Sequence, residues 1–139
     1  MLPKFQKNGC LPGGLHKASL SEIKERFGST SQERKELFRG LRSLIGLLQK
    51  HDKYIKKFLL NGSFVTAKEA PVDFDCILIV KEEFDFDSKE AKQLQFAHEL
   101  FNAHLFTFSE KDMVRCRRLI DFFGLDRERQ SKGLVEVLL

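Results

Sequence analysis

The sequence predicts a small α/β (α+β) domain in which helices flank a mixed β-sheet. Its 139 residues fit one domain of ordinary size, and 42% of them are hydrophobic, which is enough to form a core. Apolar runs typical of strands alternate with segments that repeat every three to four residues, as helices do. We therefore expect one domain over residues 1–139, and the sequence leaves the pairing directions of its strands open.

The first fifty residues divide into a leader and a helical segment. Glycine and proline interrupt residues 1–18 without periodicity, so we expect an irregular leader there. Within the helical segment, 19–50, Ser19 and Glu22 fit a capping box that begins a short helix. Apolar residues recurring every three or four positions predict a longer helix over 31–50. These positions are Leu37, Phe38, Leu41, Leu44, Ile45 and Leu48.

The rest of the chain alternates between strands and helices. Apolar runs bounded by turn residues predict four strands. These are 54–60, 73–80, 104–108 and 134–139. Helical spacing predicts one helix over 88–101, capped by Ser88, and another over 110–123. The alternation supports a sheet covered by helices.

Composition excludes several classes of protein. No apolar run approaches the roughly 20 residues that cross a bilayer, and the first residues lack the apolar stretch of a secretory leader. Cys10, Cys76 and Cys116 are odd in number and form no CxxC pair, which argues against a disulfide framework or a structural zinc site. We expect a cytoplasmic protein without a membrane segment, in which Cys10 is the most exposed thiol.

Charge is distributed unevenly along the chain. Residues 1–60 hold 13 Lys and Arg against 5 Asp and Glu, a balance of +8, whereas residues 61–139 have a balance of −4. A basic half can attract nucleic acid. Solvated faces of amphipathic helices explain the same excess, and we favour that interpretation, so nucleic-acid binding stays a minor alternative.

A glycine-serine turn and a pair of aspartates lie between the first two predicted strands. Gly62 lets the backbone approach a ligand closely, and Ser63 offers a hydroxyl and a backbone N–H to a phosphate. Asp73 and Asp75, one residue apart at a strand start, point to the same face. Because two close carboxylates repel, a divalent cation between them is favourable. Mg²⁺ prefers such carboxylates together with phosphate oxygens.

This pattern resembles the signature of the nucleotidyltransferase fold of the DNA polymerase beta superfamily, in particular its minimal prokaryotic members. The resemblance rests on Gly62-Ser63, nine further residues, and Asp73-Phe74-Asp75 followed by an apolar strand. Segments 11–20, 60–66 and 132–137 resemble an uncharacterised prokaryotic subfamily of such proteins. The resemblance thus covers nearly the whole chain.

The resemblance implies specific roles for these residues. Gly62 and Ser63 would bind the nucleoside triphosphate, and Asp73 and Asp75 would be the catalytic, metal-binding pair, holding Mg²⁺ or Mn²⁺. The implied reaction transfers a nucleoside monophosphate to an unidentified protein, RNA or small-molecule acceptor, and pyrophosphate leaves.

One departure from the superfamily pattern leaves a second function open. Active members carry a third carboxylate on a later strand, but residues 103–108 contain no Asp or Glu. His104 is our tentative third ligand or base, while Glu110 and Asp112 fit better as acids in the first turn of a helix. The alternative is a catalytically degenerate binding or regulatory subunit, for example of a toxin-antitoxin or defence pair, with a protein partner.

Overall fold

A computed structural model of the chain describes residues 1–126 and 128–139. Its elements in chain order are β1 (Leu15–Ser19), α1 (Leu20–Phe27), α2 (Gln32–Gln49), β2 (Ile55–Asn61), β3 (Phe74–Val80), α3 (Lys89–Leu94), α4 (Ala97–Phe101), β4 (Ala103–Ser109), α5 (Met113–Phe123) and β5 (Leu134–Leu138). Short 3₁₀ helices at Asp52–Tyr54 and Ser63–Val65 flank β2. The predicted mixed α+β class is confirmed.

The five strands form one mixed sheet in the order β1-β5-β2-β3-β4. β1 pairs with β5 in parallel, and β3 pairs with β4 in parallel. β2 runs antiparallel to both of its neighbours, β5 and β3. The end of β2 therefore lies beside the start of β3, and the start of β4 lies at that same end of the sheet.

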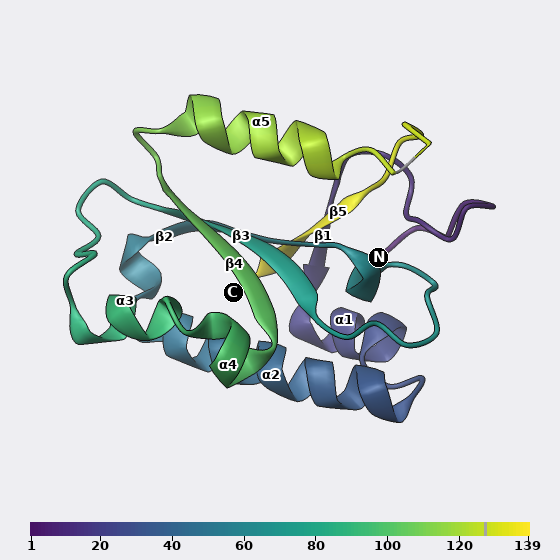
Figure 1. The fold of residues 1–139 in the computed structure, drawn as a ribbon, viewed down its shortest axis with the longest axis horizontal. Coiled ribbons are helices and arrows are strands. Elements are labelled where there is room, and N and C mark those ends of the chain that lie inside the picture. The colour runs from purple at the N-terminus through teal and green to yellow at the C-terminus, as the bar shows by residue number, and fades with distance from the viewer. Residues whose placement is uncertain (127) are drawn as a thin grey trace.

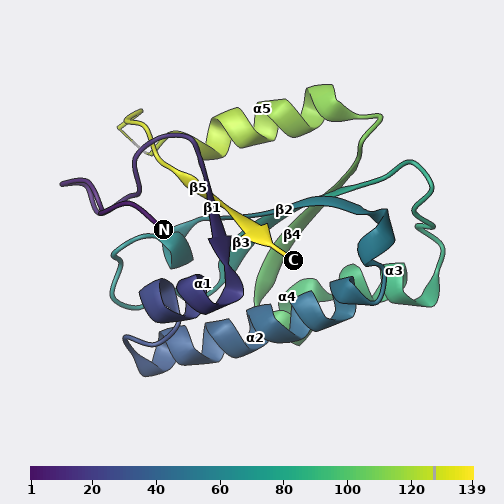
Figure 2. The ribbon, with the colours of Figure 1, turned by 180° about the vertical axis from the view of Figure 1, so that it is seen from behind.

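Helices cover both faces of the sheet. Figures 1 and 2 show α1 to α4 along one face and α5 along the other. Alternate residues of the strands supply the two sides, as the two-residue period requires. Phe58, Phe74 and Leu78 belong to the larger core on the α1–α4 side, and Leu59 and Ile77 belong to the smaller core that includes Cys116 of α5.

Capping side chains set where the helices begin. The predicted capping box is confirmed, because the Glu22 backbone N–H donates to the Ser19 hydroxyl at 3.2 Å. Ser31 caps α2 and Ser88 caps α3 in the same way. The longest helix, α2, has 18 residues and one buried face. Throughout the described ranges, no helix joins the length and apolar character that crossing a bilayer demands.

The structure corrects three expectations. Residues 15–18 of the predicted leader belong to β1, because pairing with β5 supplies backbone partners more than a hundred residues away. Cys10 is buried rather than exposed, since its segment forms a β-bridge with Thr66. The helix expected over 88–101 is two helices, separated by tighter three-residue turns at Gln95 and Phe96.

Candidate functional site

The glycine-serine turn and the second aspartate meet at one end of the sheet. Asn61, the last residue of β2, is in register with Asp75 of β3. Gly62 follows with φ +82°, a conformation that L side chains rarely adopt, and a Cβ there would collide with the Asp75 carboxylate. The predicted closeness of this turn to the aspartates therefore follows from the antiparallel pairing of β2 and β3.

β4 brings His104 between the two aspartates. Because β4 is parallel to β3, its second residue lies in register with Asp75. The His104 Nε2 atom is 3.1 Å from Asp73 Oδ2, and its Nδ1 atom is 4.0 Å from Asp75 Oδ1. His104 thus lies on the neighbouring strand and faces both carboxylates.

The surroundings of Asp75 disfavour its ionised form. Burial raises the pKa of Asp75, and the charge of Asp73 raises it further. The positive charges of His104 and Lys132 lower the pKa of Asp75, so Lys132 lies near enough to interact electrostatically with this carboxylate. A bound cation would favour ionised Asp75, as expected when two carboxylates share a small space.

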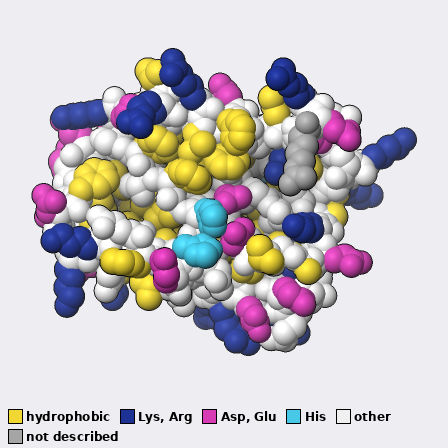
Figure 3. Space-filling view, in the orientation of Figure 1, with side chains coloured by type: hydrophobic (Ala, Val, Ile, Leu, Met, Phe, Trp, Pro, Cys, Tyr) yellow, Lys and Arg dark blue, Asp and Glu magenta, His cyan; other side chains and the backbone are white. Residues whose placement is uncertain are grey.

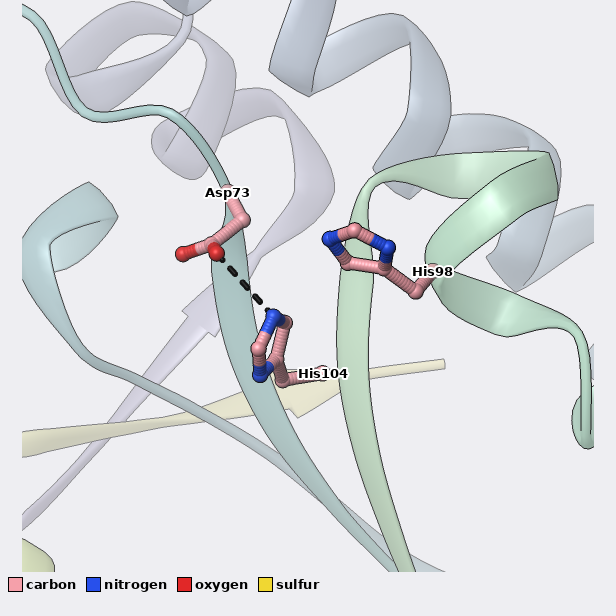
Figure 4. Close-up of side chains that lie close together, drawn as sticks. All are labelled: Asp73, His98 and His104. Carbon is pink, nitrogen blue, oxygen red and sulfur yellow. Dashed lines mark ion pairs between the residues drawn. The ribbon is translucent and has the colours of Figure 1, made fainter.

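His98 joins the cluster from α4. The imidazole rings of His98 and His104 stand edge to face with centroids 4.8 Å apart. Ligand atoms of Asp73, His98 and His104 all lie within 4.8 Å of one another, as Figure 4 shows. Gly40 allows α4 to come this close to α2, because a Cβ at Gly40 would collide with the Phe101 carbonyl.

This cluster faces solvent. In Figure 3, cyan histidine side chains lie beside magenta carboxylates near the middle of one face of the molecule. A cleft of about 350 Å³ opens between α4 and β4, and His98, His104 and Phe106 are among its lining residues. A ligand can therefore reach the histidines without a rearrangement of the backbone.

Asn61 lies buried next to the site. Its side chain is fully buried, and neither of its polar atoms has a hydrogen-bond partner among the described residues. Its position opposite Asp75 places it on the same face of the sheet. Asn61 and Asp75 therefore place an amide and a carboxylate side by side at this end of the sheet.

Arg34 holds the segment that follows the glycine-serine turn. It is buried in α2, where its guanidinium donates to the Phe64 carbonyl at 2.7 Å, the Thr66 carbonyl at 2.7 Å and the Lys68 carbonyl at 2.6 Å. A further bond of 3.1 Å reaches the Phe27 carbonyl at the end of α1. Burial lowers the pKa of Arg34. Arg34 positions the turn and touches none of the site's carboxylates.

The sequence contained signals for only some of these residues. Arg34 lies three residues before Leu37, within the buried stripe of the predicted helix, and this spacing could have identified it. His98 carries no such signal, because its approach to His104 depends on how Asn102, with φ +57°, turns the chain from α4 into β4.

The two alternative acids, Glu110 and Asp112, lie away from the cluster. Glu110 lies beyond the opposite end of β4, where it accepts from the Glu82 backbone N–H at 2.9 Å and pairs with Lys56 at 3.8 Å. Asp112 precedes α5 and lies 3.7 Å from Arg115. Neither folds back toward Asp73, whereas His104 lies 3.1 Å from it.

Fold and site together define a small α+β protein with a Gly-Ser turn, two aspartates and two histidines at one end of a mixed sheet. Residues 3–138 match a family described as "Family of unknown function (DUF6932)", and the chain belongs to that family. No curated protein and no solved structure matches it. The family description assigns no activity, so the chemistry of the site carries the functional argument.

Proposed function

We propose that this chain is a metal-dependent nucleotidyltransferase, which moves a nucleoside monophosphate from a nucleoside triphosphate to a hydroxyl of a protein, RNA or small molecule. One observation carries the proposal. The Gly62 turn packs on the Asp75 carboxylate, while His104 lies 3.1 Å from Asp73, so residues from three separate segments form one cluster. Such convergence supports a phosphate and cation site more strongly than the motif alone.

Each residue has a role in this proposal. Gly62 and Ser63 bind the phosphates, and because Gly62 has no side chain, this turn packs directly against the Asp75 carboxylate. Asp73 and Asp75 hold Mg²⁺ or Mn²⁺, which neutralises charge on the phosphate oxygens. The acceptor oxygen forms a bond to the α-phosphorus as the bond to the bridging oxygen breaks. Pyrophosphate leaves with that electron pair, and the hydroxyl proton passes to solvent.

A second candidate function follows from the residue at the third position. The His104 Nε2 atom faces Asp73 Oδ2 at 3.1 Å, and residues 103–108 lack the third carboxylate that active members of the superfamily this sequence resembles carry on a later strand. Imidazole is a poor ligand for Mg²⁺. This substitution favours a degenerate subunit that binds a nucleotide or a protein partner without transfer, for example in a toxin-antitoxin or defence pair.

Thermal unfolding with and without nucleotide tests the proposal. The chain is mixed with Mg²⁺ or Mn²⁺ and each ribonucleoside triphosphate in turn. A ligand at 100 times its Kd raises the free energy of unfolding by about 2.7 kcal/mol. We expect a metal-dependent rise in Tm that is lost in Asp73→Asn/Asp75→Asn. The matched control is Asp85→Asn/Asp87→Asn, an exposed pair with the same spacing, which should retain the rise.

A transfer assay then separates the two candidates. Incubation of the chain and a cell extract with triphosphate labelled on the α-phosphate should label an acceptor, and Asp73→Asn/Asp75→Asn should not. Nucleotide binding without any labelled product supports the degenerate subunit. If no triphosphate changes the Tm of the wild type with either metal, the transferase is wrong, and so is a degenerate subunit that binds a nucleotide.

Two further aspects of the proposal concern the environment. The three cysteines are free and buried, which suits the cytoplasm, where thiols stay reduced. Nucleic-acid binding by the basic half of the chain stays a minor alternative. It predicts an affinity that falls steeply with salt, and binding that ignores salt would contradict it.

A further inference from the structure

The two histidines next to Asp73 bear on the identity of the cation. His98 comes from α4 and His104 from β4, and both imidazoles are exposed at the mouth of the same cleft. Neither ring is needed to explain the packing of the core, since neither belongs to the buried clusters. Two imidazoles and one carboxylate within 4.8 Å form a ligand set of mixed nitrogen and oxygen atoms.

We propose that Asp73, His98 and His104 bind a divalent transition-metal ion of the Zn²⁺ class, in preference to Mg²⁺. Imidazole nitrogen suits zinc and its neighbours, whereas magnesium takes oxygen ligands and water almost exclusively. Three protein ligands also leave coordination positions for water or a phosphate oxygen, as in catalytic zinc sites. The inference rests on the proposed function for the ion's role in transfer. It replaces Mg²⁺ or Mn²⁺ on the two aspartates by a Zn²⁺-class ion on this cluster, in which Asp75 is not a direct ligand.

The observed distances suit such an ion after small side-chain movements. Ligands at about 2.0–2.2 Å from a zinc ion lie roughly 3.0–3.5 Å from one another. His104 Nε2 and Asp73 Oδ2 already have this separation at 3.1 Å. His98 has the longer path, because the three ligand atoms span up to 4.8 Å. Its side chain is exposed, so rotation can bring its nitrogen closer (Figure 4).

This arrangement gives the two aspartates different roles at the metal site. Metal on His104 Nε2 leaves the proton on Nδ1, and Nδ1 faces Asp75 Oδ1 at 4.0 Å. A carboxylate on the second ring nitrogen is the usual partner of a metal-binding histidine, where it orients the ring and raises its basicity. Asp73 is then a direct ligand. A movement of about 1 Å would bring Asp75, which also contacts the Gly62 turn, into hydrogen-bond distance of His104.

Cobalt titration of the metal-free full-length chain tests the site without any nucleotide. After treatment with a chelator, added Co²⁺ should give visible absorption that Zn²⁺ displaces and that a large excess of Mg²⁺ leaves intact. His98→Ala should weaken Co²⁺ binding by at least about tenfold, the smallest effect seen for removing even an outer partner of a metal ligand. The control His51→Ala removes a histidine that pairs with Glu90 instead and should bind as the wild type does.

Exchanging one ligand sharpens the test. His104→Asp supplies the carboxylate that magnesium prefers, so Co²⁺ affinity should fall and Mg²⁺ should become an effective competitor. The inference is overturned if Mg²⁺ displaces Co²⁺ from the wild type at equal concentration, or if His98→Ala binds Co²⁺ unchanged.

These outcomes are separate from those of the proposed function. Loss of nucleotide binding with an intact cobalt site leaves the metal inference standing and removes the transferase. A nucleotide-induced rise in Tm that needs only Mg²⁺ and survives His98→Ala leaves the transferase standing and removes the metal inference.

Discussion

Two buried polar side chains of this molecule, Arg34 and Asn61, differ in their hydrogen bonding. Arg34 is 4% exposed and donates to four backbone carbonyls. Asn61 is fully buried without a partner among the described residues, and burial raises the pKa of its neighbour Asp75. Both residues lie next to the glycine-serine segment, so their different hydrogen bonding does not come from different places in the fold. The first group has its hydrogen-bond partners within the protein, and the second has none among the described residues.

This contrast teaches how to separate structural from functional polar residues. A buried group with all of its hydrogen bonds made contributes to stability, because removing it leaves its partners buried without a hydrogen bond. A cluster of like charges costs stability, and such clusters concentrate at functional sites. Removing Arg34 should therefore lower the free energy of unfolding, whereas removing the charge of Asp75 should raise it.

The largest effect is expected at Arg34. Arg34→Met leaves four carbonyls without their donor, and we expect a loss of roughly 3 kcal/mol or more in the free energy of unfolding, measured by urea denaturation. Arg39→Met, on an exposed position of the same helix, should stay within about 0.5 kcal/mol of the wild type. An equally small loss at Arg34 would break the comparison.

Gly62 should show the next largest effect. Gly62→Ala places a Cβ against the Asp75 carboxylate at φ +82° and ψ −168°, a conformation almost restricted to glycine, and that conformation alone costs about 1–3 kcal/mol. We also expect the nucleotide-induced rise in Tm to disappear. Gly46→Ala is the matched control, because open space surrounds this glycine within α2, and it should stabilise the chain by up to about 1 kcal/mol. Normal nucleotide binding by Gly62→Ala would contradict its assigned role.

Asp75→Asn should have a smaller effect of opposite sign. Because the folded state raises the pKa of Asp75, folding takes up a proton, and stability is lost as pH rises from the ordinary aspartate pKa through the raised one. The variant escapes this loss, so its Tm should exceed that of the wild type at neutral pH. The two values should converge below the ordinary pKa.

A control and a contradiction complete this prediction. Asp85→Asn, at an exposed position, should leave Tm nearly unchanged at neutral pH. If Asp75→Asn is less stable than the wild type at neutral pH, Asp75 is a structural residue like Arg34, and the contrast between the two regions fails.

Local spacing predicted most of the fold and the first half of the site. The period of the apolar residues located α2 and the central strands, and Gly62, Ser63, Asp73 and Asp75 followed from a single segment of sequence. β1 could not be found in this way, because its partner β5 lies at the other end of the chain. His98 was missed for a related reason, since its distance from His104 depends on tertiary packing.

The position of β5 has a consequence for how the protein is made. β5 lies between β1 and β2, so the first strand to leave the ribosome has no neighbour in the sheet until residues 134–138 have followed it. β2, β3 and β4 can pair earlier, because they are adjacent in the sheet and successive in the chain. Assembly should then end with β5 pairing with β2 and bringing β1 into the sheet. Removing residues 134–138 would leave β1 without a neighbour and β2, β3 and β4 as the remaining sheet.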